Sequence, residues 1–293
     1  MKILAIGPFL GSFKEEIFTF RPYARWLSEV IEWDKIYLST HLNRVFLYDF
    51  VPEENILPVY QQFSRDEKSQ DGYVHKKLSK KDFKLILKTF KDKIMEIEGC
   101  SRKDIEIHHL SYSKNTPPYS IYNKIFHEIP KPYVKIPESI EDTLVFIPSK
   151  EERIEKLNYV YKYLRVCYDR HITLVGGVDT WFSKDNIVLN KLDYFENGWK
   201  YIIGYIARAK GVICPLGYWT GIANLQSKPV FSWGENPSIY REGGIYNFGN
   251  RKCHIIPSDD ETSPEVILNS MESFIKSISL KKENNNEIQG FCR

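Results

Sequence analysis

The strongest constraint on the fold is a stretch in the last third of the chain, where helix, strand and turn signals follow one another closely. Apolar residues recur at helical spacing over 202–209, and Gly211 follows where a helix C-cap is expected. Residues 212–214 and 230–233 predict short buried strands, and the turn 217–221 between them opens onto a second helix. This pattern is typical of an α/β domain. The turn offers backbone N–H groups to an anion, although a strand–turn–helix without a ligand explains it equally well.

Length and composition indicate two domains. The chain has 293 residues, of which 42% are hydrophobic, which is ample for packed cores. The five cysteines are odd in number and include no Cys-x-x-Cys, so we expect reduced thiols in a cytoplasmic protein. Because no run of about 18 uncharged apolar residues occurs, we expect no stable insertion into a membrane. The net charge of +3 neither requires nor excludes an anionic partner.

Both halves of the chain show the same order of elements. Strands are expected at 2–7, 35–39, 105–107, 143–147, 172–175 and 187–189, and further helices at 14–31, 76–97, 151–168 and 264–280. A proline-rich connector lies between the halves. We therefore expect an α/β fold with two doubly wound, Rossmann-like domains facing across a cleft. The predicted boundaries are 1–135 for the N-terminal domain, 136–280 for the C-terminal domain and 281–293 for a polar tail.

The second half resembles the nucleotide-sugar-binding domain of GT-B glycosyltransferases, most nearly the family-9 heptosyltransferase type. Residues 146–150 match a strand that ends in a small-residue and lysine turn, and 174–179 match a strand that ends in Gly-Gly. Residues 209–229 match the family's Ala-Lys-x-Val-Ile … Lys-Pro segment. The family's aspartate before Ser-Gly and its histidine are absent here, because other residues stand at those places.

The resemblance extends to the first half. Residues 15–22 align with the family's Gly-Asp pattern and the proline that follows, which places Glu16 where the family has its catalytic aspartate. The resemblance implies a glycosyltransferase that moves a sugar from a nucleotide-activated donor to a hydroxyl acceptor, with Glu16 as the general base at the mouth of the cleft. The alternative is that Glu15 and Glu16 are ordinary acids in a first helical turn, favoured by the helix dipole.

Donor contacts are expected at the turns that follow three strands of the second half. These residues are Ser149, Lys150, Gly176, Gly177, Asp179, Tyr218, Thr220 and Gly221. The alternative for Lys150 is a solvated residue at the start of a helix. The alternative for Gly176 and Gly177 is a tight turn after a strand that binds no ligand. No Asp-x-Asp occurs, and the sequence 259–261 is interpreted as a solvated turn, so we expect metal-independent catalysis. No cofactor is expected beyond the nucleotide-sugar co-substrate.

The N-terminal domain is expected to receive the acceptor. The candidate contacts are Ser12, Arg21, Lys80, Lys84 and Lys88. The lysines lie on the face of a predicted helix opposite its apolar stripe, which indicates either a solvated face or a surface for an anionic acceptor. The composition suggests an AT-rich bacterial or phage genome. The acceptor is then a glycoconjugate or, alternatively, phage DNA that carries a hydroxymethylated base. A third reading is a nucleotide-sugar-binding protein without catalysis.

Overall fold

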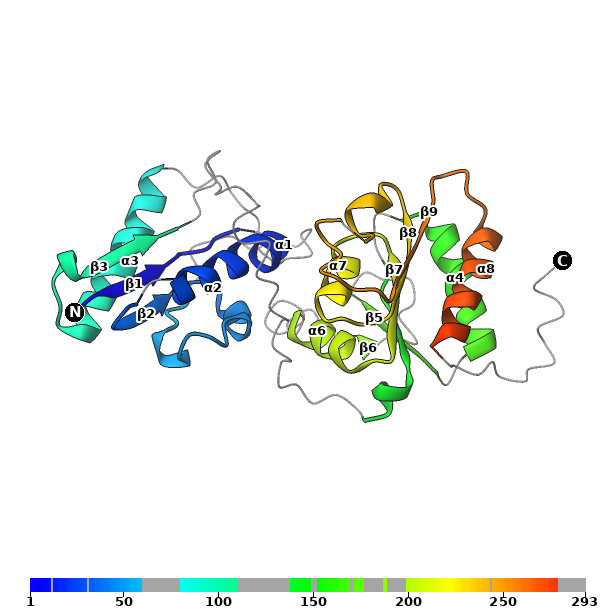
Figure 1. Ribbon diagram of the computed structural model, residues 1–293, viewed down its shortest axis with the longest axis horizontal. Helices are drawn as coiled ribbons and strands as arrows, with labels where there is room; N and C mark the ends of the chain where they lie inside the picture. The colour runs from blue at the N-terminus through cyan, green and yellow to red at the C-terminus, as the bar shows by residue number, and fades with distance from the viewer. Residues whose placement is uncertain are drawn as a thin grey trace. The chain divides into compact units, whose positions relative to one another are not determined.

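In the computed structural model the chain divides into two compact units, Met1–Pro130 and Lys131–Arg293. The structure describes residues 1–11, 13–30, 32–59, 80–109, 138–148, 152–168, 171–176, 187–188, 199–242 and 244–278. Each unit is built around a parallel sheet with helices packed on it (Figure 1). In this described part of the chain, no helix is long and apolar enough to cross a membrane.

The first unit contains a parallel sheet with β1 (Ile3–Ile6) at its centre. β2 (Lys35–Leu38) pairs with one side of β1 and β3 (Ile105–His108) with the other. In this register Ile3 lies opposite Lys35 on one side and Ile105 on the other. All four residues of β1 are fully buried, as expected for the middle strand of a covered parallel sheet.

The turn after β1 depends on a glycine. Gly7 has φ of +103°, and a Cβ atom at this position would lie 2.5 Å from the carbonyl oxygen of Ser39. Glycine is therefore required both by the backbone conformation and by the close approach of the segment that follows β2. The Gly7 N–H donates to the carbonyl of His108 at 2.7 Å, which ties this turn to the end of β3.

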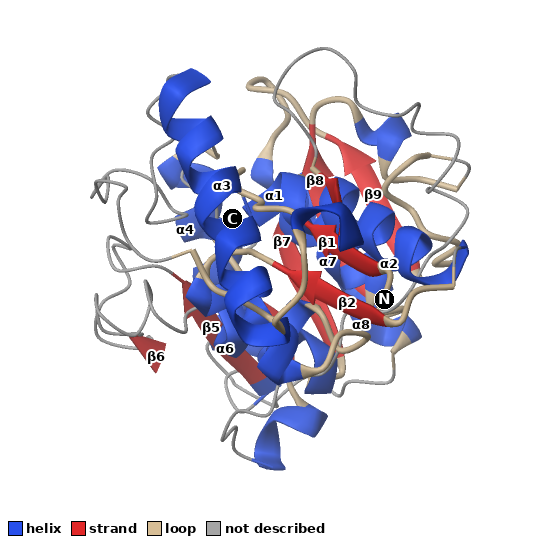
Figure 2. Cartoon of the chain, turned by 90° about the vertical axis from the view of Figure 1, so that its left-hand side faces the viewer, coloured by secondary structure: helices blue, strands red, loops and turns tan. Residues whose placement is uncertain are grey.

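The helices of the first unit agree with the expected positions, with one irregularity. The predicted helix 14–31 consists of α1 (Phe13–Glu15), one π-helical turn (Glu16–Phe20) and α2 (Arg21–Val30). α2 lies beside β1 and β2 (Figure 2). α3 (Lys80–Glu98) covers a face of the sheet, because its buried Phe90 and Ile94 pack against side chains of all three strands.

The second unit has six parallel strands among the described residues. They are β4 (Leu144–Phe146), β5 (Ile172–Gly176), β6 (Ile187–Val188), β7 (Gly211–Pro215), β8 (Val230–Gly234) and β9 (Cys253–Pro257). Their order in the sheet is β6-β5-β4-β7-β8-β9. The chain therefore builds outward from β4 and then outward from β7 in the opposite direction, which is the order of a Rossmann fold.

Helices cover both faces of the second sheet (Figure 1). The helices are α4 (Ile154–Tyr168), α6 (Trp199–Arg208), α7 (Tyr218–Leu225) and α8 (Pro264–Ser277). α4 and α8 pack together on one face around Phe231, Trp233 and Met271. α6 and α7 lie on the other face. The predicted α/β architecture with two doubly wound units is confirmed.

Two expectations about the second unit were wrong or incomplete. Gly211 is not a helix C-cap, because α6 ends at Arg208 and Gly211 is the first residue of β7. A Cβ at this position would lie 2.9 Å from the Leu144 side chain, so the glycine permits close packing of β7. The strand β9 was not predicted at all. The described part of the predicted connector is a 3-10 turn at Glu138–Asp142.

Candidate functional site

The carboxyl ends of β1 and β2 surround the side chain of Glu16, which has no exposed surface. Arg44 Nη1 lies 2.7 Å from one carboxylate oxygen. The Tyr48 hydroxyl donates to the other oxygen at 2.6 Å, and the Thr40 hydroxyl donates to the same atom. Arg44 also donates to the carbonyl of Gly11 at 2.7 Å. The carboxylate is thus held by three side chains from the segment that follows β2, and Glu16 and Arg44 form a buried ion pair.

Burial raises the pKa of Glu16, because a carboxylate removed from water is harder to ionise. The positive charge of Arg44 opposes this effect most strongly, followed by the hydrogen bonds from Thr40 and Tyr48. The pKa of the Tyr48 phenol is raised well above its usual value by the same burial and by the neighbouring carboxylate. Tyr48 therefore acts as a hydrogen-bond donor to Glu16 at neutral pH.

Glu16 is distinct from an ordinary first-turn acid, because its neighbour Glu15 is exposed while Glu16 is completely buried. A carboxylate with a raised pKa at the carboxyl edge of a parallel sheet is suited to accept a proton. It is also a good anchor for the segment that carries Arg44. A substrate reaches the carboxylate only when the contacts of Arg44 and Tyr48 open, so the general-base role stays a prediction.

Sequence reasoning missed the partners of Glu16. Thr40, Arg44 and Tyr48 lie 24, 28 and 32 residues further along the chain. The only signal was the presence of an arginine and a tyrosine in a largely apolar stretch that follows a strand.

The other candidate acceptor contacts are dispersed. Arg21 is almost fully buried, and its Nε donates to the carbonyl of Leu47 at 2.6 Å. Its guanidinium also lies 3.5 Å from the carboxylate of Asp49. Burial lowers the pKa of Arg21, and Asp49 opposes that shift. Ser12 lies outside the described residues. Arg21 thus anchors the segment after β2, and a contact with substrate stays a prediction.

Lys80, Lys84 and Lys88 are exposed on α3, while Phe90 and Ile94 of the same helix are buried. The predicted amphipathic arrangement of this helix is confirmed. The exposed face fits both earlier interpretations, a solvated surface and a surface for a polyanion.

In the second unit the structure describes four of the eight predicted donor residues, and they lie at or directly after the carboxyl ends of β5 and β7. Gly176 ends β5, and Tyr218, Thr220 and Gly221 form the first turn of α7 directly after β7. Because β4, β5 and β7 are parallel neighbours, their carboxyl ends meet at one edge, where open α/β sheets bind ligands. Ser149, Lys150, Gly177 and Asp179 lie outside the described residues.

The hydroxyl of Thr220 faces the protein interior. It lies 2.9 Å from the hydroxyl of Ser232 and 3.6 Å from the Cys214 sulfur, and all three side chains are fully buried. It also accepts the N–H of Gly217 at 3.3 Å. These contacts fix the turn between β7 and α7, while Tyr218 is half-buried at its start. Direct binding of phosphate by Thr220 stays a prediction.

Each unit contains a cavity. The cavity of the first unit has a volume of about 710 Å³ and lies between α3 and the segment after β2. Its wall is largely apolar, and includes Ile56, Leu57, Val59, Leu85, Ile86 and Phe90. The cavity of the second unit has a volume of about 260 Å³ and lies at the carboxyl ends of β7, β8 and β9. Over the described ranges, no three His, Cys, Asp or Glu side chains come together as a metal site.

Three solved structures share this architecture along nearly the whole chain. ADP-heptose LPS heptosyltransferase II of E. coli has a TM-score of 0.51 at 12% identity, covering 96% of this chain and 100% of that one. E. coli heptosyltransferase WaaC with ADP has a TM-score of 0.51 at 11% identity, covering 94% and 100%. A family-9 glycosyl transferase of Veillonella parvula has a TM-score of 0.52 at 10% identity, covering 94% and 97%.

These similarities confirm the predicted resemblance in fold to GT-B glycosyltransferases of the family-9 type. At such low identity they establish the fold alone. No protein-family model matches the sequence, and no curated protein sequence does.

Proposed function

We propose that this chain is a glycosyltransferase that transfers a sugar from a nucleotide-activated donor to a hydroxyl group of an acceptor. The proposal is supported chiefly by the similarity of fold to two heptosyltransferases and a family-9 glycosyl transferase, which extends over 94–96% of the chain. One of those structures contains ADP. The buried carboxylate at the carboxyl edge of the first sheet supplies the base that such a transfer requires.

In the proposed reaction the acceptor oxygen attacks the anomeric carbon of the donor sugar while its proton passes to the Glu16 carboxylate. The bond from the anomeric carbon to the diphosphate breaks, and the nucleoside diphosphate leaves with the bonding electrons. Backbone N–H groups in the first turn of α7 stabilise the charge on that leaving group. Ser149 and Lys150, which follow β4 in the sequence, are proposed to assist. The reaction uses the nucleotide-sugar as co-substrate and is proposed to need no metal.

The proposal predicts that a nucleoside diphosphate stabilises the protein against heat. A ligand that binds only the folded state at about 100 times its Kd adds about 2.7 kcal/mol. For a unit of about 160 residues this corresponds to a rise in Tm of roughly 5–10 °C. The measurement is a thermal melt of the full chain with ADP, UDP, GDP, CDP or dTDP, with the matching nucleosides as controls. If none of the five diphosphates raises Tm at millimolar concentration, the proposal is wrong.

The acceptor is proposed to be a glycoconjugate of a bacterium or phage. The largely apolar cavity of about 710 Å³ beside α3 favours an acceptor with an apolar part over a nucleic-acid backbone. The exposed lysines of the same helix favour the alternative, a phage enzyme that glycosylates a hydroxymethylated base in DNA.

Salt dependence separates these two acceptors. If duplex DNA is the acceptor, its affinity for the full chain should fall at least about tenfold between 50 and 200 mM salt, because lysine contacts release counterions. Reversal of Lys80, Lys84 and Lys88 to glutamate should then flatten that dependence without changing donor hydrolysis. The measurement is fluorescence anisotropy of a labelled duplex.

The control is the same reversal of Arg251, Lys252 and Lys276, which are exposed in the second unit. An equal loss of DNA affinity in both triple variants would indicate that only the net charge of the protein matters. Affinity for DNA that does not change with salt in the parent protein would exclude the DNA acceptor.

A further inference from the structure

The carboxylate of Glu16 is covered by a segment that follows β2, residues 42–50, which we call the latch. Two side chains of the latch, Arg44 and Tyr48, contact the carboxylate directly, and both are at most 1% exposed. The third contact comes from Thr40, which precedes the latch. Because Glu16 itself has no exposed surface, an acceptor hydroxyl reaches it only after the latch has moved.

The contact between Tyr48 and Glu16 has the geometry that a general base needs with its substrate. The phenol donates a hydrogen bond to Oε1 at 2.6 Å, and a base must lie within about 2.6–3.2 Å of the atom whose proton it removes. Glu16 also begins a π-helical turn, Glu16–Phe20, a feature that is frequent at functional sites. Tyr48 therefore occupies the place that an acceptor hydroxyl would take on this carboxylate.

The backbone on either side of the latch is fixed. Before the latch, the Val59 N–H donates to the carbonyl of Thr40 at 2.7 Å, and His41 forms a β-bridge with Val59. After the latch, Val51 is buried. Thr40 can therefore keep its hydroxyl on Glu16 when the latch moves, which leaves the carboxylate oriented.

The backbone of the latch is bonded locally. The N–H groups of Arg44, Tyr48 and Val51 each donate to the carbonyl three residues earlier, at 2.9–3.1 Å. Leu42–Leu47 form a 3-10 helix, whose hydrogen bonds have poorer geometry than those of an α-helix. Such local bonds can move with the segment, so they do not oppose its opening.

A second charged side chain holds the far end of the latch. Arg21 Nε donates to the carbonyl of Leu47 at 2.6 Å, and its guanidinium lies 3.5 Å from the Asp49 carboxylate. The outer side of the latch meets solvent, since Leu42 is 59% exposed and the Asp49 side chain 51% exposed. A buried ion pair such as the one beneath the latch is often no more stabilising than well-packed apolar residues, so stability alone does not account for it.

We propose that the latch controls access to Glu16: in the resting protein Tyr48 occupies the place of the acceptor hydroxyl, and the acceptor binds only when residues 42–50 move away. The part that concerns the acceptor rests on the proposed function. Opening also removes Arg44, which makes the carboxylate a stronger proton acceptor, because the cation favours the ionised form. The closed latch keeps water from the carboxylate and so suppresses hydrolysis of the donor.

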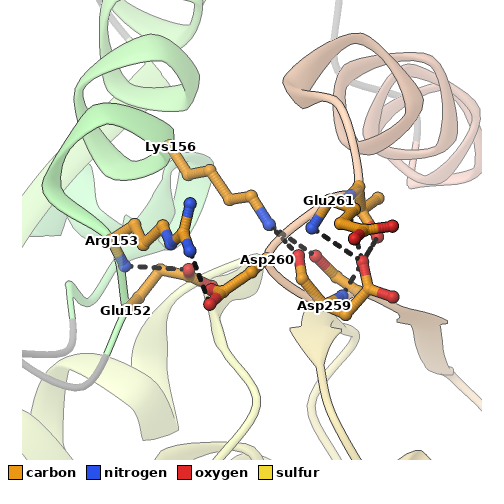
Figure 3. A network of polar contacts seen from close by, with 8 residues as sticks. Glu152, Arg153, Lys156, Asp259, Asp260 and Glu261 are labelled. Atoms are coloured by element: carbon orange, nitrogen blue, oxygen red, sulfur yellow. Dashed lines mark hydrogen bonds and ion pairs between the residues drawn. The ribbon is translucent and has the colours of Figure 1, made fainter.

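Carboxylate labelling of the full chain tests the latch without any substrate. The reagents are a carbodiimide and glycinamide, and coupling at each carboxylate is read by peptide mass spectrometry. Glu15 is exposed and should react quickly, whereas its neighbour Glu16 should be protected at least about tenfold. The reference for pairing without burial is Asp260, which lies 2.5 Å from Arg153 but is 70% exposed (Figure 3). Asp260 should react nearly as fast as Glu15.

Three variants show whether the protection comes from the latch. Tyr48→Phe removes the hydroxyl and should raise the labelling rate of Glu16 about tenfold, the equivalent of one hydrogen bond to a charged group. Asp49→Asn weakens the second attachment at an exposed position and should raise that rate about two- to fivefold. The matched control is Tyr37→Phe in β2 of the same sheet. It removes a hydroxyl that donates to the Glu98 carboxylate, and should leave Glu16 protected.

Hydrogen exchange separates opening of the latch from unfolding of the whole unit. In Tyr48→Phe the amides of Arg44 and residue 48 should exchange about tenfold faster, while those of β1 should not change. Hydrolysis of the donor without acceptor should rise about three- to tenfold in this variant, with the Kd of the nucleoside diphosphate unchanged.

The outcomes separate this inference from the proposed function. If Glu16 of the parent protein reacts as fast as Glu15, or if Tyr48→Phe and Tyr37→Phe respond alike, the latch is wrong and the proposed function stands. Faster exchange in β1, or slower donor hydrolysis with Glu16 still protected, would also overturn the latch. If labelling and exchange respond as expected but no nucleoside diphosphate binds, the latch stands and the proposed function fails.

Discussion

Replacing Arg44 with methionine is expected to destabilise the first unit by about 3–5 kcal/mol, because the substitution leaves a buried carboxylate without its cation. Arg44 and Glu16 have no exposed surface and lie 2.7 Å apart. Methionine fills most of the arginine's volume, so the loss of stability reflects the missing positive charge rather than a new cavity. The measurement is hydrogen exchange of the full chain, read at the amides of β1 and β2, with urea unfolding as a second measure.

Two further variants show whether the loss comes from the ion pair. The double variant Glu16→Gln with Arg44→Met should recover most of the lost stability, since no charge is then buried. Arg25→Met removes an ion pair on the surface of α2, where Arg25 lies 2.5 Å from Glu29, and should cost at most about 1 kcal/mol. Equal losses from Arg25→Met and Arg44→Met would contradict a special role for the buried pair.

The sign of the pH dependence follows from the raised pKa of Glu16. In the folded state this carboxyl holds its proton to a higher pH than the usual 4.5. Folding is therefore favoured by protonation of this group, and its contribution to stability falls as pH rises from about 4.5 through the raised pKa. Without Arg44 the pKa rises further. The destabilisation in Arg44→Met should consequently be larger at pH 8 than at pH 5.

The architecture could be predicted because buried strands of a parallel sheet are short apolar runs. Residues 144–146, 212–214 and 230–233 have this character and form central strands. The strand β9 was missed because it lies at the edge of the sheet, where only Ile255 of its five residues is buried. Its sequence Cys-His-Ile-Ile-Pro has no clear apolar pattern, and its pairing with β8 is a long-range contact.

The candidate sites were only partly predictable, because their residues meet through the fold. The position of Glu16 near the first strand could be inferred, but its burial depends on Arg44 and Tyr48 from beyond the second strand. Asp259 and Asp260 were interpreted as a solvated turn. Both are exposed, yet they also belong to the wall of a cavity whose other walls come from β7 and β8. Spacing along the chain carries no information about such neighbours.

The other large effect is expected from Glu16→Gln, which should reduce turnover by about 100-fold or more if Glu16 is the general base. Glutamine has the size of glutamate and can still accept hydrogen bonds from Thr40 and Tyr48, but it cannot take the acceptor's proton. The Kd of the nucleoside diphosphate should change little, because Glu16 belongs to the first unit and the proposed donor residues to the second. The measurement is release of nucleoside diphosphate from the donor in the presence of acceptor.

The pH profile distinguishes a base from a structural anchor. A general base works when deprotonated, so kcat of the parent protein should rise with pH through a pKa above 4.5. The residual activity of Glu16→Gln should lack this acidic limb. Because the variant leaves Arg44 buried without its carboxylate, the double variant Glu16→Gln with Arg44→Met provides a folded reference that also lacks the base. If that double variant is stable and retains the acidic limb with near-normal turnover, Glu16 is an anchor of the first unit and the base lies elsewhere.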